Sequence, residues 1–168
     1  MKINVAQVKK EIGSRQPFTF ITPACNMDVS QLRFELVDDV KVTGEVVNNG
    51  RALEVSGVIY ARMASRCDRC LEAFDAPLDI AFQEVFQETV DQVADETADV
   101  AYYQDDEIEL AGLVEENLLM AEPLKALCKP GCLGLCPQCG VNRNVSPCHC
   151  SHDDIDPRLA KLRQLLKE

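Results

Sequence analysis

Cysteine spacing is the strongest constraint on this chain. Nine cysteines stand in 168 residues, and eight of them form four close pairs: Cys67/Cys70, Cys128/Cys132, Cys136/Cys139 and Cys148/Cys150. One to three residues separate the thiols of each pair, a spacing that lets both sulfurs reach one metal ion. The first eleven residues lack the apolar run of a secretion signal, which argues against a disulfide scaffold. The pattern predicts a cytoplasmic protein with reduced, metal-binding cysteines.

The last two pairs carry the clearest metal signal. Cys136-Pro-Gln-Cys139-Gly140 has the spacing of a zinc knuckle, and Cys148-His-Cys150 follows after eight intervening residues. Four thiolates satisfy a tetrahedral zinc ion and leave no open position. We therefore predict one structural Zn²⁺ with the ligands Cys136, Cys139, Cys148 and Cys150. The sequence leaves open that His149 or His152 replaces one of these cysteines.

A second zinc site would require the two earlier pairs to meet through folding, because 57 residues separate Cys70 from Cys128. Its ligands would be Cys67, Cys70, Cys128 and Cys132. In an alternative grouping, Cys128 and Cys132 join Cys136 and Cys139, which leaves Cys67 and Cys70 as a redox-active dithiol. An iron–sulfur cluster is a further alternative. The ninth cysteine, Cys25, has no partner in the sequence and is expected to be a small buried side chain.

Hydrophobic patterning predicts β structure in the first half of the chain and helices later. The expected strands cover residues 17–21, 32–36, 40–47, 53–60 and 78–85, and Asn48-Asn49-Gly50 predicts a tight hairpin turn. Apolar residues at helical spacing predict a helix over 110–120, and a capping Asp156 followed by Pro157 predicts another over 156–166. We predict an α+β fold: an antiparallel β meander, or partly open barrel-like sheet, with a few helices and a C-terminal zinc-ribbon-like tail.

Negative charge is concentrated in the middle of the chain. The net charge is −11, and residues 67–127 alone carry 17 acidic and two basic groups, a net −15. The acidic stretch 91–107 has few large apolar residues and predicts a loop. We predict a core domain over 1–127, with an acidic connection near 88–109, and a Cys-rich zinc-binding tail with a terminal helix over 128–168 that packs on the core. A solubilising loop and a surface for a basic partner both fit this charge.

The sequence contains no arrangement typical of an active site. Its two histidines both lie beside tail cysteines, and it has neither a phosphate-binding glycine loop nor an H-E-x-x-H motif. A metal ion closed in by four thiolates has no position for a reacting water. No apolar run reaches the roughly 18 residues of a membrane helix. We predict a protein that is not an enzyme, does not bind membranes and has no small-molecule substrate.

Several motifs, taken in order, resemble one protein family. They are Cys67-Asp-Arg-Cys70-Leu-Glu72, Glu107-Ile-Glu-Leu110, Gly134-Leu-Cys-Pro-Gln-Cys-Gly-Val-Asn142, Cys148-His-Cys150 and Asp156-Pro-Arg-Leu-Ala160. The ordered set resembles the YceD family of bacterial and plastid proteins over roughly residues 30–166. The resemblance implies a role in the accumulation of large-subunit (23S) ribosomal RNA, and hence in ribosome biogenesis. It implies no catalytic step.

A net charge of −11 opposes diffuse binding to RNA phosphates. Two modes of ribosomal association are compatible with this charge. In one mode, basic residues near the cysteines contact the large-subunit rRNA precursor: Arg62, Arg66, Arg69, Lys129 and Arg143. In the other, the acidic middle segment binds a basic ribosomal protein, which we favour because the charge excess is the larger signal. The alternative functions are a zinc-dependent nucleic-acid-binding regulator and a thiol oxidoreductase that uses Cys67 and Cys70.

Overall fold

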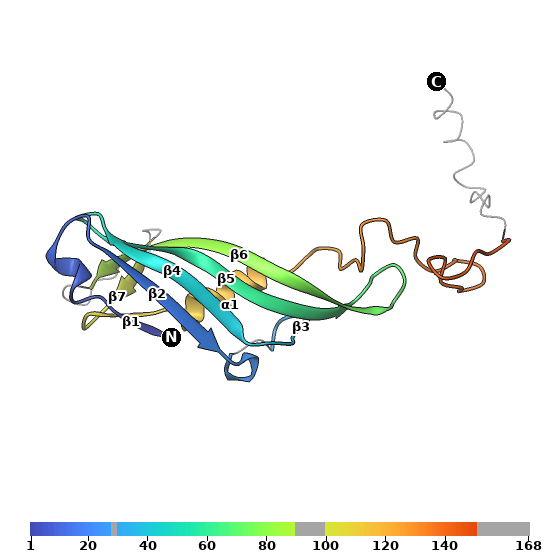
Figure 1. The fold of residues 1–168 in the computed structure, drawn as a ribbon, viewed down its shortest axis with the longest axis horizontal. Helices are drawn as coiled ribbons and strands as arrows, with labels where there is room; N and C mark the ends of the chain where they lie inside the picture. The colour runs from blue at the N-terminus through green and yellow to red at the C-terminus, as the bar shows by residue number, and fades with distance from the viewer. Residues whose placement is uncertain (28–29, 90–99, 151–168) are drawn as a thin grey trace, which may run out of the picture.

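A computed structural model describes residues 1–27, 30–89 and 100–150 and shows a molecule elongated along its main sheet (Figure 1). The helix predicted over 156–166 and His152 lie outside the described residues. In chain order the elements are β1 (Lys2–Asn4), the 3₁₀ turn η1 (Val8–Lys10), β2 (Arg15–Thr22), the 3₁₀ turn η2 (Ala24–Asn26), β3 (Glu35–Leu36), β4 (Val40–Asn48), β5 (Leu53–Arg66), β6 (Ala73–Glu88), β7 (Ala101–Tyr103), β8 (Glu107–Glu109) and α1 (Ala111–Met120).

The main sheet has six strands and is open. Its order is β2-β4-β5-β6-β7, with β3 paired to β5, and every pairing except β6 with β7 is antiparallel. The predicted turn joins β4 to β5: the Gly50 N–H donates to Oδ1 of Asn48 at 2.8 Å, and Gly50 has a φ of +88° that suits glycine. The predicted α+β fold with an open, largely antiparallel sheet is confirmed.

β5 and β6 form a hairpin longer than the sequence predicts. They contain 14 and 16 residues, and the whole of β5 pairs with β6, from Leu53 opposite Phe86 to Arg66 opposite Ala73. The added length escaped prediction because small alanines, among them Ala64 and Ala76, replace large apolar residues there. The hairpin therefore projects beyond β4 and carries Cys67 and Cys70 at its tip, where the chain after α1 also arrives (Figure 1).

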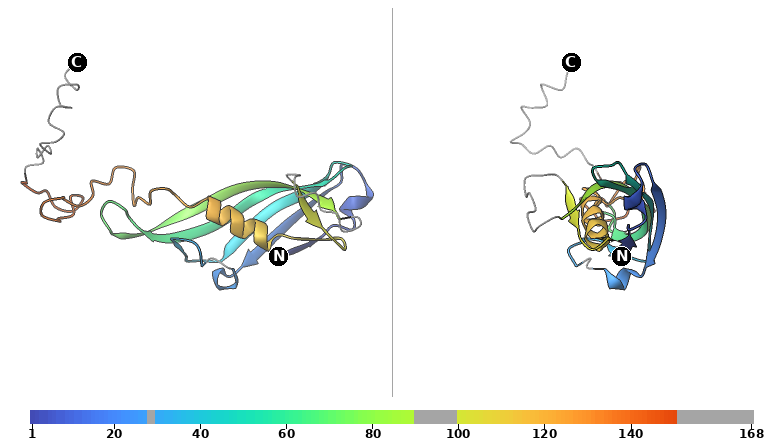
Figure 2. Two further views of the ribbon diagram at one scale, coloured as in Figure 1. Left: turned by 180° about the vertical axis from the view of Figure 1, so that it is seen from behind. Right: turned by 90° about the vertical axis from the view of Figure 1, so that its left-hand side faces the viewer.

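Helix α1 fills the concave side of the sheet. Figure 2 shows the strands curving around it. Val114 and Leu118 of α1 are fully buried, and they belong to one core cluster with residues of β4 and β5 such as Val42 and Ile59. The helix predicted over 110–120 is confirmed by Ala111–Met120. Within the described residues, no helix combines the length and apolarity that crossing a membrane requires.

A pair of facing glycines lies in the middle of the sheet. Gly44 of β4 opposes Gly57 of β5, and their outer neighbours in the same row are Phe18 of β2 and Phe82 of β6. A Cβ atom on Gly57 would overlap the carbonyl oxygen of Thr43 and lie 3.0 Å from Cε1 of Phe82. The two glycines thus allow close approach of the strands and leave room for the flanking aromatic rings.

The acidic middle segment contains more regular structure than expected. The loop prediction over 91–107 is wrong for Ala101–Tyr103, which form β7 parallel to β6, and for Glu107, where β8 begins and pairs with β1. Each of these strands buries one large side chain, Tyr103 or Ile108, between exposed or half-buried neighbours. One buried apolar residue in a three-residue strand produces no alternating pattern from which a strand could be predicted. Residues 32–36 show the opposite error, because only Glu35–Leu36 are in a strand.

Candidate metal centres

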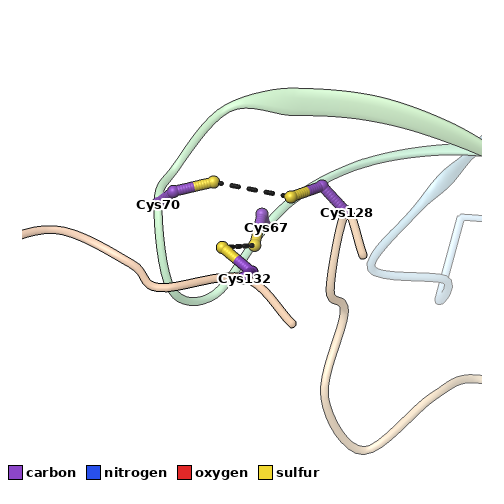
Figure 3. Close-up of side chains that lie close together, drawn as sticks. All are labelled: Cys67, Cys70, Cys128 and Cys132. Carbon is purple, nitrogen blue, oxygen red and sulfur yellow. Dashed lines mark hydrogen bonds between the residues drawn. The ribbon is translucent and has the colours of Figure 1, made fainter. Parts of the chain in front are cut away.

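The first cysteine group joins the hairpin tip to the chain after α1 (Figure 3). The Sγ atoms of Cys67 and Cys132 lie 3.8 Å apart, and those of Cys70 and Cys128 lie 3.7 Å apart. A tetrahedral zinc ion with Zn–S bonds of about 2.3 Å places its sulfurs about 3.8 Å from one another, whereas a disulfide requires about 2.0 Å. The sulfurs therefore have the separation of ligands around a metal ion.

The second group consists of Cys136, Cys139, Cys148 and Cys150. In each group the four Sγ atoms lie within 4.8 Å of one another, so both groups could hold a metal ion. The structure does not have the alternative arrangement in which Cys128 and Cys132 join Cys136 and Cys139. His149 is exposed and lies outside the second group. Cys25 is also exposed, so the expectation that it is buried is wrong.

Both C-x-x-C pairs have the backbone geometry of a metal knuckle. Hydrogen bonds from the backbone N–H groups of Cys128, Cys70 and Arg69 lower the pKa of the Cys67 thiol to about 6. The N–H groups of Cys139 and Gln138 lower the pKa of Cys136 to about 6 in the same way. The thiolate is the form that binds metal, and each pair has donors two and three residues after its first cysteine, to which the Cys128 N–H adds a third at Cys67.

The thiols of Cys128 and Cys150 need a cation to become ligands. Burial raises the pKa of the Cys128 thiol to about 12, and a side-chain hydrogen bond with Cys139 is the main cause that raises the pKa of Cys150 to about 12. Four thiolates so close together repel one another, and a bound divalent cation offsets that repulsion and deprotonates the remaining thiols. The donor set suits a soft or borderline metal ion with four sulfur ligands.

Hydrogen bonds connect the C-terminal segment, residues 122–150, to the hairpin tip. Asp68 exchanges two bonds of 2.8 Å with Ala126: its backbone N–H donates to the Ala126 carbonyl, and its Oδ2 accepts the Ala126 N–H. The Leu135 N–H donates to the Arg69 carbonyl at 2.9 Å. Gly134 has a φ of +72°, and a Cβ atom there would lie 2.9 Å from the same Arg69 carbonyl. The four cysteines of the first group are therefore placed by two chain segments that are far apart in sequence.

The five predicted RNA or partner contacts fall into different environments. The Arg69 guanidinium donates to the Cys132 carbonyl at 2.8 Å, so this residue is part of the first cysteine group's surroundings. Arg62 lies 4.0 Å from the Asp38 carboxylate, and Arg66 lines a cavity of about 550 Å³ beside the hairpin. Lys129 and Arg143 are exposed on the C-terminal segment.

Two asparagines to which the sequence analysis gave no role connect to the first cysteine group: Asn144 contacts Cys132, and Asn142 contacts Asn144. Asn144 donates from Nδ2 to Sγ of Cys132 at 3.3 Å and accepts the Leu133 N–H at 2.9 Å. Asn142 accepts the Asn144 N–H at 3.0 Å and donates to Glu72 at 3.3 Å. Both lie between the ligands Cys139 and Cys148, where neither periodicity nor ligand spacing distinguishes them from ordinary loop residues.

The residue after each C-x-x-C pair adopts a left-handed conformation. Leu71 has a φ of +61° and Gly140 a φ of +73°, and their N–H groups donate to the carbonyls of Cys67 and Cys136 at 2.8 and 2.9 Å. A left-handed backbone costs a residue with a Cβ about 1–2 kcal/mol. The first knuckle therefore holds a strained leucine where the second holds a glycine.

Replacing Leu71 with glycine is expected to raise the free energy of unfolding of the metal-loaded protein by up to about 1 kcal/mol, because relief of strain outweighs the added chain entropy. The Leu71 side chain is 59% exposed and loses little packing. Denaturant titration at fixed zinc concentration measures the change. The matched variant Gly140→Ala should lower stability by about 1 kcal/mol, since no atom lies within 4 Å of its new Cβ and only the backbone opposes it. A decrease in the free energy of unfolding on Leu71→Gly would contradict backbone strain at Leu71.

Comparison with known proteins decides the family. The family model described as large ribosomal RNA subunit accumulation protein YceD matches residues 55–166. This chain belongs to the YceD family. The matched region begins within β5 and includes both cysteine groups.

Curated relatives of this chain are named as uncharacterized proteins. An uncharacterized protein of Mycobacterium tuberculosis is 34% identical over 130 residues, which cover 76% of this chain and 61% of the relative. The chain thus spans less than two-thirds of the length of that relative. The uncharacterized protein YlbN of Bacillus subtilis is 27% identical over 157 residues, which cover 92% of this chain and 91% of YlbN. No solved structure matches the chain.

Proposed function

We propose that this chain is a cytoplasmic, non-enzymatic factor that supports the accumulation of 23S ribosomal RNA during ribosome assembly. The observation that carries the proposal is membership of the family named for large ribosomal RNA subunit accumulation. The chemistry of the cysteine groups is consistent with a structural role, because four thiolates leave a metal ion no position for substrate.

The direct partner in this proposal is a basic ribosomal protein. Two cavities of about 470 and 440 Å³ share Tyr102 and Glu109 as lining residues. Further carboxylates line them, including Glu84 and Glu116, whereas Glu107 pairs with Lys2 at 3.0 Å and Glu109 with the N-terminal amine at 2.6 Å. An acidic surface around an aromatic side chain suits lysine- and arginine-rich segments and repels RNA phosphates.

Zinc is the metal that we assign to both centres. The sulfur separations of 3.7 and 3.8 Å support this choice for the first group, and the all-thiolate donor set supports it for both. An oxidoreductase that uses Cys67 and Cys70 is a weaker proposal. Cys67 and Cys70 lie 3.8 and 3.7 Å from Cys132 and Cys128, the separations of ligands around one ion, and a redox role for the C-x-x-C pair alone would leave this arrangement unexplained.

Depletion of the chain from its host cell is expected to lower the ratio of 23S to 16S ribosomal RNA, because only the large-subunit RNA depends on the factor. Quantitative RNA electrophoresis after depletion measures the ratio, and re-expression of the wild-type chain is expected to restore it. An unchanged ratio would overturn the proposed function, irrespective of metal content.

Two pairs of substitutions distinguish the partners. Neutralising the acidic surface with Glu84→Gln and Glu116→Gln should prevent rescue and release the basic ribosomal protein from the affinity-purified chain. The matched pair Lys129→Ala and Arg143→Ala should leave both the rescue and the retention of the ribosomal protein unchanged. The reverse pattern would assign the contact to rRNA.

A further inference from the structure

The two cysteine groups are adjacent and share one short stretch of chain. Cys132 is the last ligand of the first centre and Cys136 the first ligand of the second, four residues later. The chain between them pairs with the loop that separates Cys139 from Cys148: Leu135 forms a bridge with Asn142, and the Arg143 N–H donates to the Gly134 carbonyl at 3.0 Å. Fixing one centre therefore constrains the backbone that supports the other.

Asn144 is the side chain that spans this junction. Its backbone lies in the second centre's loop, while its Nδ2 donates to a first-centre ligand, Sγ of Cys132, at 3.3 Å. Its Oδ1 accepts the N–H of Leu133, the next residue after that ligand, at 2.9 Å. Asn142 holds the amide in place, because its Oδ1 accepts from the Asn144 Nδ2 at 2.9 Å.

The bond to Cys132 depends on the position of that sulfur. An ion held by the first group would fix Sγ of Cys132 where the Asn144 amide reaches it at 3.3 Å, and would so hold Asn144 in place. Holding Asn144 orders the loop before Cys148 and reduces the ordering cost of the second centre. The effect is reciprocal by thermodynamic linkage.

We propose that the two centres bind their metal ions cooperatively and that Asn144 is the positioning residue that couples them. The inference rests on the proposed metal binding and adds that an ion bound at one centre raises the metal affinity of the other. Mutation of a residue that hydrogen-bonds to a metal ligand typically lowers the affinity of the site for metal by about 10- to 100-fold. We expect occupancy of one centre to raise the affinity of the other about 10-fold.

Cobalt binding to the full chain measures this coupling, because Co²⁺ held by four thiolates has a characteristic absorption spectrum. The overall constant for two Co²⁺ ions in the wild-type chain is divided by the product of two single-ion constants. One comes from the variant Cys67→Ser/Cys70→Ser, which lacks the first centre, and the other from Cys139→Ser/Cys148→Ser, which lacks the second. The quotient is the coupling factor, with an expected value of about 10.

The same three measurements in an Asn144→Ala background should give a coupling factor of about 1. Asn144→Asp, which retains the acceptor for Leu133 but lacks the Nδ2 donor, should also fall below the wild-type value. The control Asn117→Ala removes a bond of 2.8 Å to the Leu113 carbonyl within α1 and should leave the factor unchanged. Circular dichroism verifies that each variant retains the sheet.

Three results would overturn the inference: a wild-type factor of about 1, an equal factor with and without Asn144, or loss of Co²⁺ from both centres in the Asn144 variants. The last would contradict it because a coupling residue leaves each centre able to bind alone. Absence of a tetrahedral thiolate spectrum in the wild-type chain would instead reject the proposed metal binding itself, so the two failures are distinguishable.

Discussion

Removal of the two metal ions that we propose is expected to release residues 122–150 from the hairpin tip and to leave the sheet folded. This segment contains no helix or strand, and its buried cluster at the tip consists of cysteines with little more than Phe74 and Leu127 around them. Structural zinc contributes roughly 10–16 kcal/mol in small zinc-binding peptides. The sheet and α1 have a separate core that contains none of the cysteines.

Hydrogen exchange after chelation measures this release. The amides of Asp68, Ala126, Leu135 and Cys136 each donate a bond within the two centres, and their protection should fall by about 100-fold or more. Amides of β4 and β5 should keep theirs. Unchanged protection of the segment would show that its hydrogen bonds hold it without metal.

Single substitutions separate the role of metal ligands from that of cysteine in general. Cys132→Ser should reproduce the loss of protection around the hairpin tip, because it removes one ligand and the acceptor of Asn144. The control Cys25→Ser should have no effect, since Cys25 is exposed and belongs to neither group. An equal effect of both variants would contradict a specific centre.

Gly57→Ala is expected to destabilise the protein by about 2–3 kcal/mol through overpacking of the sheet. The added Cβ would overlap the Thr43 carbonyl, a backbone atom within a ladder, and would lie 3.0 Å from both Gly44 Cα and Phe82 Cε1. Moving these atoms requires β4 and β5 to separate at the centre of the fold.

The same substitution in α1 is the matched control. A Cβ on Gly112 would meet no atom within 4 Å beyond the backbone of its own helix and its chain neighbours, so Gly112→Ala should raise the free energy of unfolding by up to about 1 kcal/mol through helix propensity. Denaturant unfolding of the two variants at constant zinc concentration tests the pair. Equal changes at both positions would refute a requirement for close approach at Gly57.

Local signals were sufficient for much of the fold. The turn at Asn48-Asn49-Gly50, the strands beside it and α1 follow from turn chemistry and from side-chain periodicity of two and 3.6 residues. The sequence could not predict β7 and β8, because each depends on one buried residue that pairs with a distant partner. It also could not predict the length of the β5–β6 hairpin, where alanines carry no pattern.

The candidate site was predictable in its ligands and less so in its arrangement. Spacing alone identifies Cys136, Cys139, Cys148 and Cys150 as one candidate ligand set. It cannot determine that Cys67 and Cys70 meet Cys128 and Cys132, because that contact depends on how far the hairpin projects. Nor does it reveal Asn144, whose role arises only when two loops lie side by side.

The metal content of the full chain, purified without added metal, tests the central claim most directly. We predict two zinc ions per chain, bound by the two Cys₄ groups, and one ion in the Cys67→Ser/Cys70→Ser variant. A wild-type chain that contains no zinc, or that contains iron with inorganic sulfide in its place, would contradict the account.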